Sequence, residues 1–421
     1  QMNYWPALQG NLKETLEPYF DYYESMLDDY RENAEKLYNC RGIMAPISQS
    51  THGLIWPSPW IVWTAGAGWL ARLFYDYWLY TGDKEFLRDR AVPFLKEVAL
   101  FYEDFLIEDE NGELVFVPSL SPENTPSIEN PSLAVVNATM DVAIAKEVLN
   151  NLINACELLD IEDKNLDKWK KMLAKLPDYK VNEDGAIKEW IHDELPDNYH
   201  HRHQSHIYPL FPGLEVTKEE EPELYEAIET AVEKRLIIGL TSQTGWSFAH
   251  MANIYARLGK GERALECLEL LSRSCVGPNL FTYHNDWRSQ GLTMFWGQDS
   301  QPPFQIDANF GFTAAVMEML LYSKPGMIKF LPALPEKWEK GEVEGLIARG
   351  GIETALEWDL NKKYLNINLK TDSSQKITVK FPEVPQKIHT SDIEVDESEY
   401  GKKYRSIKLP IGESNIKVKF K

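Results

Sequence analysis

The spacing of apolar residues changes near residue 326, and this change most limits the folds open to the chain. Before it, as in residues 12–39, apolar side chains recur every three or four residues, which is the period of an amphipathic helix. After it, segments such as "KYLNINLK" and "SNIKVKFK" alternate apolar and polar residues, which is the period of a strand. The sequence therefore predicts a helical domain over residues 1–325 and a small antiparallel β domain over residues 326–421.

Helical stripes recur throughout the first part of the chain. Besides residues 12–39, they lie at residues 65–80, 84–107, 138–160, 163–175, 221–238, 245–258, 261–275 and 309–323. Adjacent helices of this kind fit either an α-solenoid or a closed toroid of helix pairs with a central pocket. A solenoid repeats at a fixed length, whereas these connections vary and carry the aromatic and ionisable residues typical of functional loops. The pattern therefore favours the toroid.

The charge balance excludes one class of partner. The 421 residues include 65 acidic and 44 basic side chains, for a net charge of −21. Recognition of a phosphate backbone needs clustered Lys and Arg, so we predict no nucleic-acid partner. The sequence holds no run of 18 apolar residues that would predict a membrane span. A neutral or cationic small molecule is the expected partner.

The cysteines do not predict a cofactor or metal site. None of Cys40, Cys156, Cys267 and Cys275 has CxxC or CxxH spacing, so neither a disulfide scaffold nor a structural zinc site is expected. We predict reduced cysteines in the core. The 13 Trp and 20 Tyr residues mainly serve core packing, but their flat rings also suit a sugar site, and Trp69 and Trp246 are the predicted substrate-binding aromatics.

Glu123 is the acid of the proline-rich stretch "PSLSPENTPS", residues 118–127. Its three prolines exclude a helix. An acid on a rigid loop can be fixed within hydrogen-bond reach of a group that it protonates. The alternative is a solvated surface glutamate.

Residues 198–213, "NYHHRHQSHIYPLFPG", concentrate histidines. The cluster comprises His200, His201, Arg202, His203 and His206. These histidines do not match HExxH, and no nearby carboxylate completes a metal set. Directional donors for a polyol fit better, and a structural network of satisfied histidines is the alternative.

The stretch "PPFQIDANFGF" places Asp307 and Asn309 inside an aromatic run. An ionised carboxylate is costly to bury unless it is paired. Either residue could cap the helix that follows, or Asp307 could work beside a second catalytic group. Both can hold, because a helix N-terminus stabilises an ionised acid.

Glu123 and Asp307 together suggest a pair of catalytic carboxylates. Glycoside hydrolysis needs one group that protonates the leaving oxygen and another that activates water or attacks carbon. An acidic pocket lined by aromatic rings also suits a neutral sugar and a cationic transition state. We therefore predict that the two acids converge across one cleft.

Seven stretches, taken in order, resemble one known family. They are "QMNYWPA", "WLYTGD", "PSLSPEN", "HHRHQSHIYPLFPG", "TGWS", "PPFQIDANFGF" and "FLPALPEKWEKGEVEGLIARGG". The family is glycoside hydrolase family 95, the inverting α-L-fucosidases that include the 1,2-α-L-fucosidases, and the resemblance covers about residues 1–358. It implies an (α/α)6 barrel flanked by β domains and hydrolysis, with inversion, of terminal α-L-fucosyl or α-L-galactosyl residues.

The resemblance also implies roles for single residues. Glu123 matches the general acid, and Asp307 matches an aspartate that polarises an asparagine, which in turn positions the attacking water. Arg202 and His203 match a pair that contacts the sugar. We add Asn309, Trp246 and Trp69 as substrate-binding residues, and we expect no metal or cofactor.

Three departures from the family pattern stand out. Ala308 replaces a usual glycine, and residues 281–301, "FTYHNDWRSQGLTMFWGQDSQ", form a longer segment before the Asp307 motif. The family's catalytic asparagines precede the "QMNYW" stretch, so they are expected before Gln1, and Asn3 is not a substitute for them. We therefore expect a mainly α fold, a partial (α/α)6 toroid followed by the β domain, whose partner is the remaining N-terminal part. The sequence does not predict a cellular compartment.

Two other functions stay open at this stage. One is a related (α/α)6 hydrolase or phosphorylase of another sugar, whose phosphorylase form would be stimulated by phosphate. The other is a carbohydrate-binding or scaffold protein without catalysis, in which Glu123→Gln would leave binding unchanged.

Overall fold

The computed structural model describes residues 2–56, 59–127, 129, 131–295, 301–391 and 393–421. The chain forms two compact units. The first unit comprises Gln1–Leu16, Leu79–Gly82 and Gly239–Lys421, and the second comprises Glu17–Trp78 and Asp83–Ile238.

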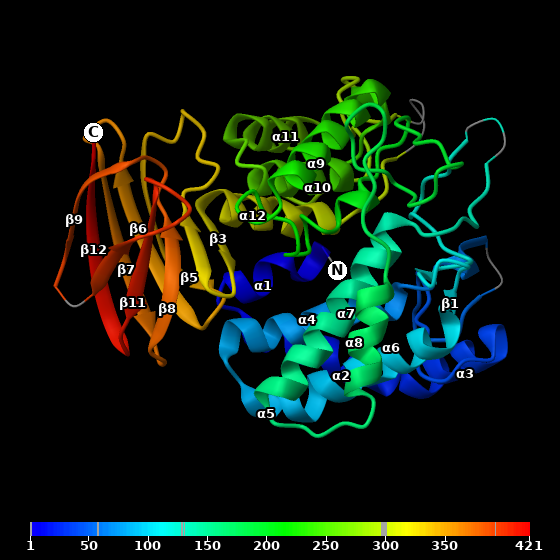
Figure 1. The fold of residues 1–421 in the computed structure, drawn as a ribbon. Helices are drawn as coiled ribbons and strands as arrows, with labels where there is room; N and C mark the ends of the chain where they lie inside the picture. Colours follow the sequence, from blue (N-terminus) through cyan, green and yellow to red (C-terminus); the bar gives the residue numbers. More distant parts are fainter. Residues whose placement is uncertain (1, 57–58, 128, 130, 296–300, 392) are drawn as a thin grey trace. The chain divides into compact units, whose positions relative to one another are not determined.

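The second unit is helical. Its elements are α2 (Glu17–Ser25), α3 (Leu27–Tyr38), η3 (Pro59–Val62), most of α4 (Gly66–Thr81), α5 (Lys84–Phe86), the π-helix η4 (Leu87–Ala91), α6 (Val92–Phe105), the short strands β1 (Ile107–Glu108) and β2 (Leu114–Val115), α7 (Thr139–Leu158), α8 (Leu166–Lys175), η5 (Ser205–Ile207), α9 (Pro222–Arg235) and η6 (Leu236–Ile238). Helix α7 contacts both α6 and α8, and the three helices run together in Figure 1.

Aromatic packing supports this helical unit. The Phe74 ring on α4 stacks on Phe94 of α6, with 4.4 Å between ring centroids, and lies 4.7 Å from Phe20 of α2. All three side chains are buried, so apolar burial is the main force that holds these helices together. Asp83 caps α5 by accepting a hydrogen bond from the backbone N of Phe86 at 2.9 Å.

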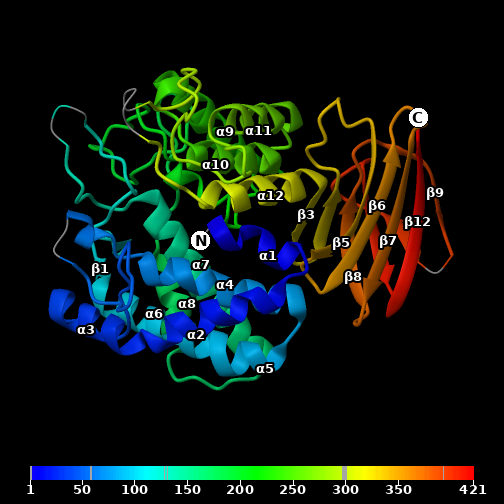
Figure 2. The same cartoon turned by 180° about the vertical axis from the view of Figure 1, so that it is seen from behind.

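The first unit begins with helices. They are η1 (Met2–Tyr4), α1 (Trp5–Gln9), η2 (Lys13–Leu16), η7 (Leu240–Ser242), α10 (Gly245–Arg257), α11 (Gly261–Ser274) and α12 (Asp307–Leu320). Thr244 and Ser247 form a capping box at the start of α10. Helix α10 packs on α11 and α12, and α1 lies beside α12 (Figure 2). The Gln9 side chain fastens α1 there by donating to Leu321 O at 2.7 Å.

Two five-stranded sheets complete the first unit (Figure 1). One has the order β10-β11-β8-β4-β3 and the other β5-β6-β7-β12-β9. The strands are β3 (Leu321–Lys324), β4 (Met327–Phe330), β5 (Lys340–Ala348), β6 (Ile352–Asp359), β7 (Tyr364–Thr371), β8 (Gln375–Lys380), β9 (Pro385–Thr390), β10 (Glu394–Glu397), β11 (Tyr404–Leu409) and β12 (Gly412–Phe420). Alternate residues of both sheets, such as Ile367 and Ile407, share one apolar core.

The observed elements confirm the helical part and the antiparallel β domain, with three differences. The helix predicted over residues 12–39 is divided into the 3-10 helix η2 and the helices α2 and α3, with Met26 as a turn residue between the last two. The β4–β8 pair is parallel, whereas the other pairings of the two sheets among the described residues are antiparallel. Strands begin at Leu321, so "FLPALPEKW" connects β4 to β5 rather than helices to sheets. The domain boundary placed near residue 325 stays a prediction.

The cysteine prediction is confirmed, since all four cysteines are buried and free of disulfide bonds. No helix in the described part of the chain is long and apolar enough to cross a bilayer.

Candidate active site

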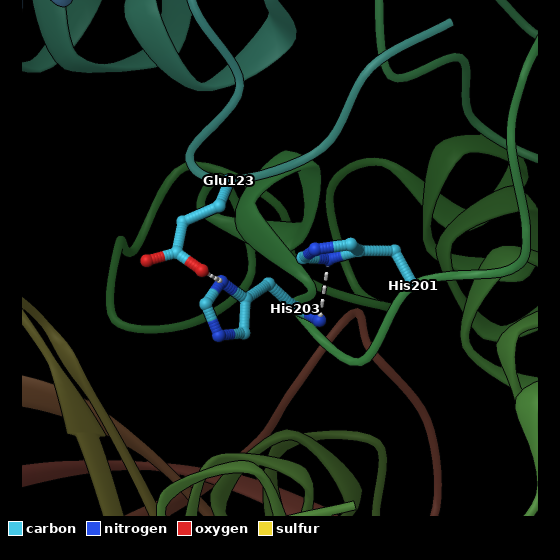
Figure 3. Close-up of side chains that lie close together, drawn as sticks. All are labelled: Glu123, His201 and His203. Atoms are coloured by element: carbon cyan, nitrogen blue, oxygen red, sulfur yellow. Dashed lines mark hydrogen bonds and ion pairs between the residues drawn. The ribbon is translucent and has the colours of Figure 1, made fainter. Parts of the chain in front are cut away.

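Glu123 lies at the centre of one group of predicted site residues. It belongs to the acid loop, residues 116–127, which follows β2. Its Oε2 lies 3.3 Å from Arg202 Nη2 and 3.8 Å from His203 Nδ1. Figure 3 shows the Glu123 carboxylate and the His203 ring pointing toward one another. The structure thus brings together three residues that the sequence analysis selected from distant stretches.

The Glu123 carboxylate remains reachable, with 41% of its side chain exposed, whereas Arg202 and His203 are 23% and 15% exposed. A group of this kind can exchange a proton with a bound molecule while a fixed cation lies next to it. The peptide bond between Pro122 and Glu123 is cis.

A buried carboxylate, Glu189, is hydrogen-bonded to the acid loop. It accepts hydrogen bonds from Ser121 Oγ at 2.7 Å and from Asn124 Nδ2 at 2.6 Å, so it grips the loop on both sides of Glu123. Burial raises the pKa of Glu189, and the charge of Arg235 and the two loop donors oppose this rise. Glu189 therefore fixes the backbone that carries the predicted acid.

Arg235, at the end of α9, connects the acid loop to the histidine loop, which we define as residues 198–207. Its Nη2 donates to Glu189, and its Nη1 donates to His203 O at 2.6 Å and to His201 O at 3.3 Å. Only 3% of the Arg235 side chain is exposed. The Glu189–Arg235 pair thus sets the separation between Glu123 and the backbone of the histidines.

Two further contacts join the same loops. Asn198 Nδ2 donates to Asn124 Oδ1 at 3.2 Å, and Asn124 Nδ2 donates to Asn198 O at 3.0 Å. Ser205 Oγ donates to Pro122 O, one residue before Glu123. Because several polar contacts act together, the loops form one connected network rather than two independent segments.

Asp141, on α7, holds the start of the acid loop. Its Oδ2 accepts from Ser119 Oγ at 2.6 Å and from Leu120 N at 3.2 Å, and its Oδ1 accepts from Trp63 Nε1 at 3.1 Å. Burial raises the pKa of Asp141 to about 7, although these donors favour the ionised form. Trp69, the predicted aromatic of this unit, packs edge-on against Trp63 at 5.2 Å between ring centroids.

His201 is neutral near pH 7. Burial, followed by the charges of Arg235 and Arg202, lowers its pKa to about 3. Its Nδ1 accepts a hydrogen bond from His203 N at 3.1 Å, the second dashed line in Figure 3. His201 therefore shapes the turn of the histidine loop without adding charge.

The second group of predicted residues lies in the first unit, around the start of α12. Asp307 is the first residue of this helix, and the N-cap position belongs to Ile306. The expectation that Asp307 or Asn309 caps the helix is therefore wrong. The Asp307 carboxylate lies in the first turn, where the helix dipole stabilises a negative charge.

The Asn309 side chain makes hydrogen bonds within the protein. Its Oδ1 accepts from Thr282 N and from Thr282 Oγ1, each at 2.9 Å, and its Nδ2 donates to Leu280 O at 2.8 Å. These bonds tie residues 280–282 to α12. Its predicted role in substrate binding stays a prediction.

Trp246 lies in the first turn of α10, near the Asp307 segment. Its backbone N donates to Gln305 Oε1 at 2.8 Å, and its ring lies 4.9 Å from the His250 ring, which Trp5 approaches to 5.7 Å. Burial lowers the pKa of His250 to about 3, so this ring is also neutral near pH 7. Gln305, two residues before Asp307, is thus hydrogen-bonded to Trp246, whose ring packs in a cluster with His250 and Trp5.

The two groups belong to different units, so the convergence of Glu123 and Asp307 stays a prediction. Trp296 and Asp299, an aromatic and an acidic residue of the longer segment 281–301, lie outside the described residues. Sequence reasoning missed Glu189, Arg235 and Asp141. A signal was available for Glu189 and Asp141, since each is an acid inside an apolar stretch, "IKEWI" and "TMDVAIA".

Family models match nearly the whole chain. The model "Glycosyl hydrolase family 95 catalytic domain" matches residues 1–320, and the model "Glycoside hydrolase family 95, C-terminal domain" matches residues 322–414.

Curated relatives support the same assignment. "Alpha-L-fucosidase 2" of Arabidopsis thaliana is 38% identical over 85% of this chain and 42% of its own length. "Probable alpha-fucosidase A" of Aspergillus niger is 27% identical over 85% of this chain and 46% of its own length. The chain therefore spans about half the length of these relatives.

A solved structure supports the fold. The "Putative kojibiose phosphorylase from human microbiome" superposes with a TM-score of 0.59 at 14% identity, over 89% of this chain and 57% of that chain. At this identity the likeness concerns the fold alone. It shows a helical core of the (α/α)-barrel type with an antiparallel β domain after it.

Proposed function

Because the chain belongs to glycoside hydrolase family 95, we propose that it hydrolyses terminal α-L-fucosyl residues of oligosaccharides, or α-L-galactosyl residues of similar shape. One observation carries this proposal. Glu123 reaches Arg202 and His203, at 3.3 and 3.8 Å, inside the region that matches the family's catalytic domain.

Glu123 is the general acid in this proposal. Its exposed carboxyl group donates a proton to the glycosidic oxygen, which lets a poor leaving group depart. Arg202, whose guanidinium lies beside Glu123, stabilises the carboxylate that remains after proton transfer. Arg202 and His203 also present N–H donors suited to the hydroxyl groups of the sugar.

Asp307 acts on the opposite side of the sugar. It polarises an asparagine side chain, and the asparagine positions a water molecule for attack on the anomeric carbon. The product then has inverted configuration. In inverting enzymes the two groups lie about 6.5–9.5 Å apart to leave room for this water, and the intervening asparagine allows a larger separation here.

Product analysis tests the proposal. The natural gene product is incubated with a panel of α-L-fucosides and α-L-galactosides, and the reaction is followed by NMR from the first turnover. We expect release of the free sugar with the β-anomer appearing first. An α-configured first product would exclude inversion, and a sugar phosphate formed on addition of phosphate would favour a phosphorylase instead.

A further inference from the structure

Glu123, His201 and His203 form a group that the sequence could not reveal. One potential ligand atom from each residue lies within 4.8 Å of the other two, and Figure 3 shows the three side chains together. A carboxylate with two imidazoles is a donor set that suits zinc and similar divalent cations. Metal binding was set aside earlier because no carboxylate follows closely in sequence, but the acid loop supplies one.

We propose that Glu123, His201 and His203 bind a divalent transition-metal ion of the zinc type, and that the bound ion withholds Glu123 from proton transfer. The second half of this inference rests on the proposed function, whereas the first half does not. Coordination occupies the Glu123 carboxylate that the proposed reaction uses, so the bound ion is inhibitory.

The hydrogen bonding of His201 suits metal binding. A histidine ligates through a ring nitrogen that carries no proton. His201 Nδ1 accepts from His203 N at 3.1 Å, so this nitrogen already presents a lone pair. Coordination through Nδ1 exchanges this hydrogen bond for a coordinate bond.

The geometry requires a small adjustment. Ligands of a tetrahedral zinc ion lie about 2.1 Å from the metal and hence roughly 3.4 Å from one another. The three ligand atoms lie within 4.8 Å of one another, and Glu123 Oε2 is 3.8 Å from His203 Nδ1. The exposed Glu123 carboxylate can move closer to the two rings by side-chain rotation. Three protein ligands leave a fourth position for water.

Arg202 determines the strength of the site. Its guanidinium lies 3.3 Å from Glu123 Oε2, so it competes with the metal for the carboxylate and repels a cation. The ion is therefore held reversibly and is removed by a chelator, unlike the ion of a closed structural site.

The binding test uses cobalt and zinc on the tag-free protein. Tetrahedral cobalt should give a visible absorption band, which zinc then abolishes by displacement. His201→Phe keeps the shape of the ring but removes both nitrogens, and Glu123→Gln removes the charge. Each should weaken zinc binding by at least about tenfold in calorimetry. His200→Ala is the matched control, since His200 is exposed, adjacent and outside the group, and its zinc affinity should equal that of the wild type.

A second variant of His201 shows whether a loss of zinc affinity comes from the missing ligand or from misfolding. His201→Asn keeps an acceptor for His203 N but offers only an amide to the metal, and it should also lose zinc affinity. Circular dichroism and the unfolding midpoint show whether each variant is folded. The absence of a cobalt band in the wild type, or unchanged zinc affinity in both folded His201 variants, would overturn the inference.

Inhibition is measured separately. Zinc should block hydrolysis of α-L-fucosides, EDTA should restore it, and His201→Phe should need at least about ten times more zinc for half-inhibition. If the three residues bind metal but no hydrolysis occurs, the proposed function fails while the metal site stands. If hydrolysis continues when calorimetry shows the site to be saturated, the inhibitory role is wrong.

Discussion

Glu123 and Asp307 carry the same type of side chain, but the chain positions them by different means. Glu123 lies on a loop outside helices and strands, and the buried side chains of Glu189, Arg235 and Asp141 hold that loop. Asp307 is the first residue of α12. A helix fixes its own backbone through internal hydrogen bonds, so the position of Asp307 depends on the helix rather than on a carboxylate that grips a loop.

The difference teaches what an irregular loop costs. An ionised group can be kept inside a protein only when it is paired and hydrogen-bonded. Glu189 meets this condition through Ser121, Asn124 and Arg235. The Asp307 region instead relies on neutral amides, since Gln305 and Asn309 bind the backbones of Trp246 and Thr282. The first region should therefore be the more sensitive to loss of one charge.

The largest expected effect comes from Arg235→Met. It leaves Glu189 buried without its cation, which should lower the free energy of unfolding by about 3–5 kcal/mol. Urea denaturation measures the change. Arg257→Met is the matched control, because Arg257 Nε binds Glu318 at 2.6 Å in the first unit and is equally buried.

The two arginine variants separate stability from positioning. Both should be destabilised, but only Arg235→Met should lower kcat per folded molecule, because Arg235, unlike Arg257, binds the histidine loop. If Arg235→Met stays within about 1 kcal/mol of the wild type, the buried pair does not support the acid loop.

The next effect separates the chemical roles of the two acids. Glu123→Gln should slow hydrolysis of a natural glycan by at least ~100-fold, or about 2.7 kcal/mol. It should slow an aryl fucoside much less, since a good leaving group needs no proton. Asp307→Asn should slow both substrates alike, because water attack is required for each. Equal losses for the two variants on both substrates would contradict the assigned roles.

The pH dependence of stability tests Asp141. Its pKa is raised to about 7 in the folded protein from 3.8, so the folded state binds more protons than the unfolded state between these values. This contribution is complete below about pH 4 and is lost progressively as the pH rises from about 4 to 7, by about 4 kcal/mol in all. Unfolding at several pH values, compared with Asp141→Asn, isolates it. A variant with the same pH profile as the wild type would show that Asp141 does not titrate there.

The smallest effect concerns Asn309. Asn309→Ala removes the acceptor of the Thr282 amide and should cost about 1–2 kcal/mol. Hydrogen exchange should show faster exchange of that amide, with α10 protected as before. Unchanged protection of Thr282 would mean that other contacts hold residues 280–282.

The sequence predicted those parts that depend on local pattern. Helix and strand periods placed most elements, and the family resemblance named Glu123, Arg202 and His203, which the structure brings together. It did not predict that Glu189 and Arg235 join the acid loop to the histidine loop, because their role arises from contacts between stretches far apart in the chain. No spacing rule connects Ser121 with Glu189, whereas a capping box such as Thr244–Ser247 is entirely local.

Asn309 shows a second limit of sequence reasoning. An amide beside a predicted catalytic acid suggests ligand binding, but its nitrogen donates to Leu280 O and its oxygen accepts from Thr282. The group of Glu123, His201 and His203 shows the opposite limit. Its histidines stand out in the sequence, but the carboxylate beside them comes from another loop, which no sequence spacing indicates.

The junction between α12 and β3 has a consequence for how such chains can be divided. The helix ends at Leu320 and the strand begins at Leu321, with no residue between them, and both side chains belong to the core shared by the two sheets. A gene fusion or truncation at this peptide bond would therefore divide one hydrophobic core rather than a flexible linker. The two sheets therefore support α12, the helix that begins at Asp307. We expect α12 and the sheets to unfold together in one cooperative transition.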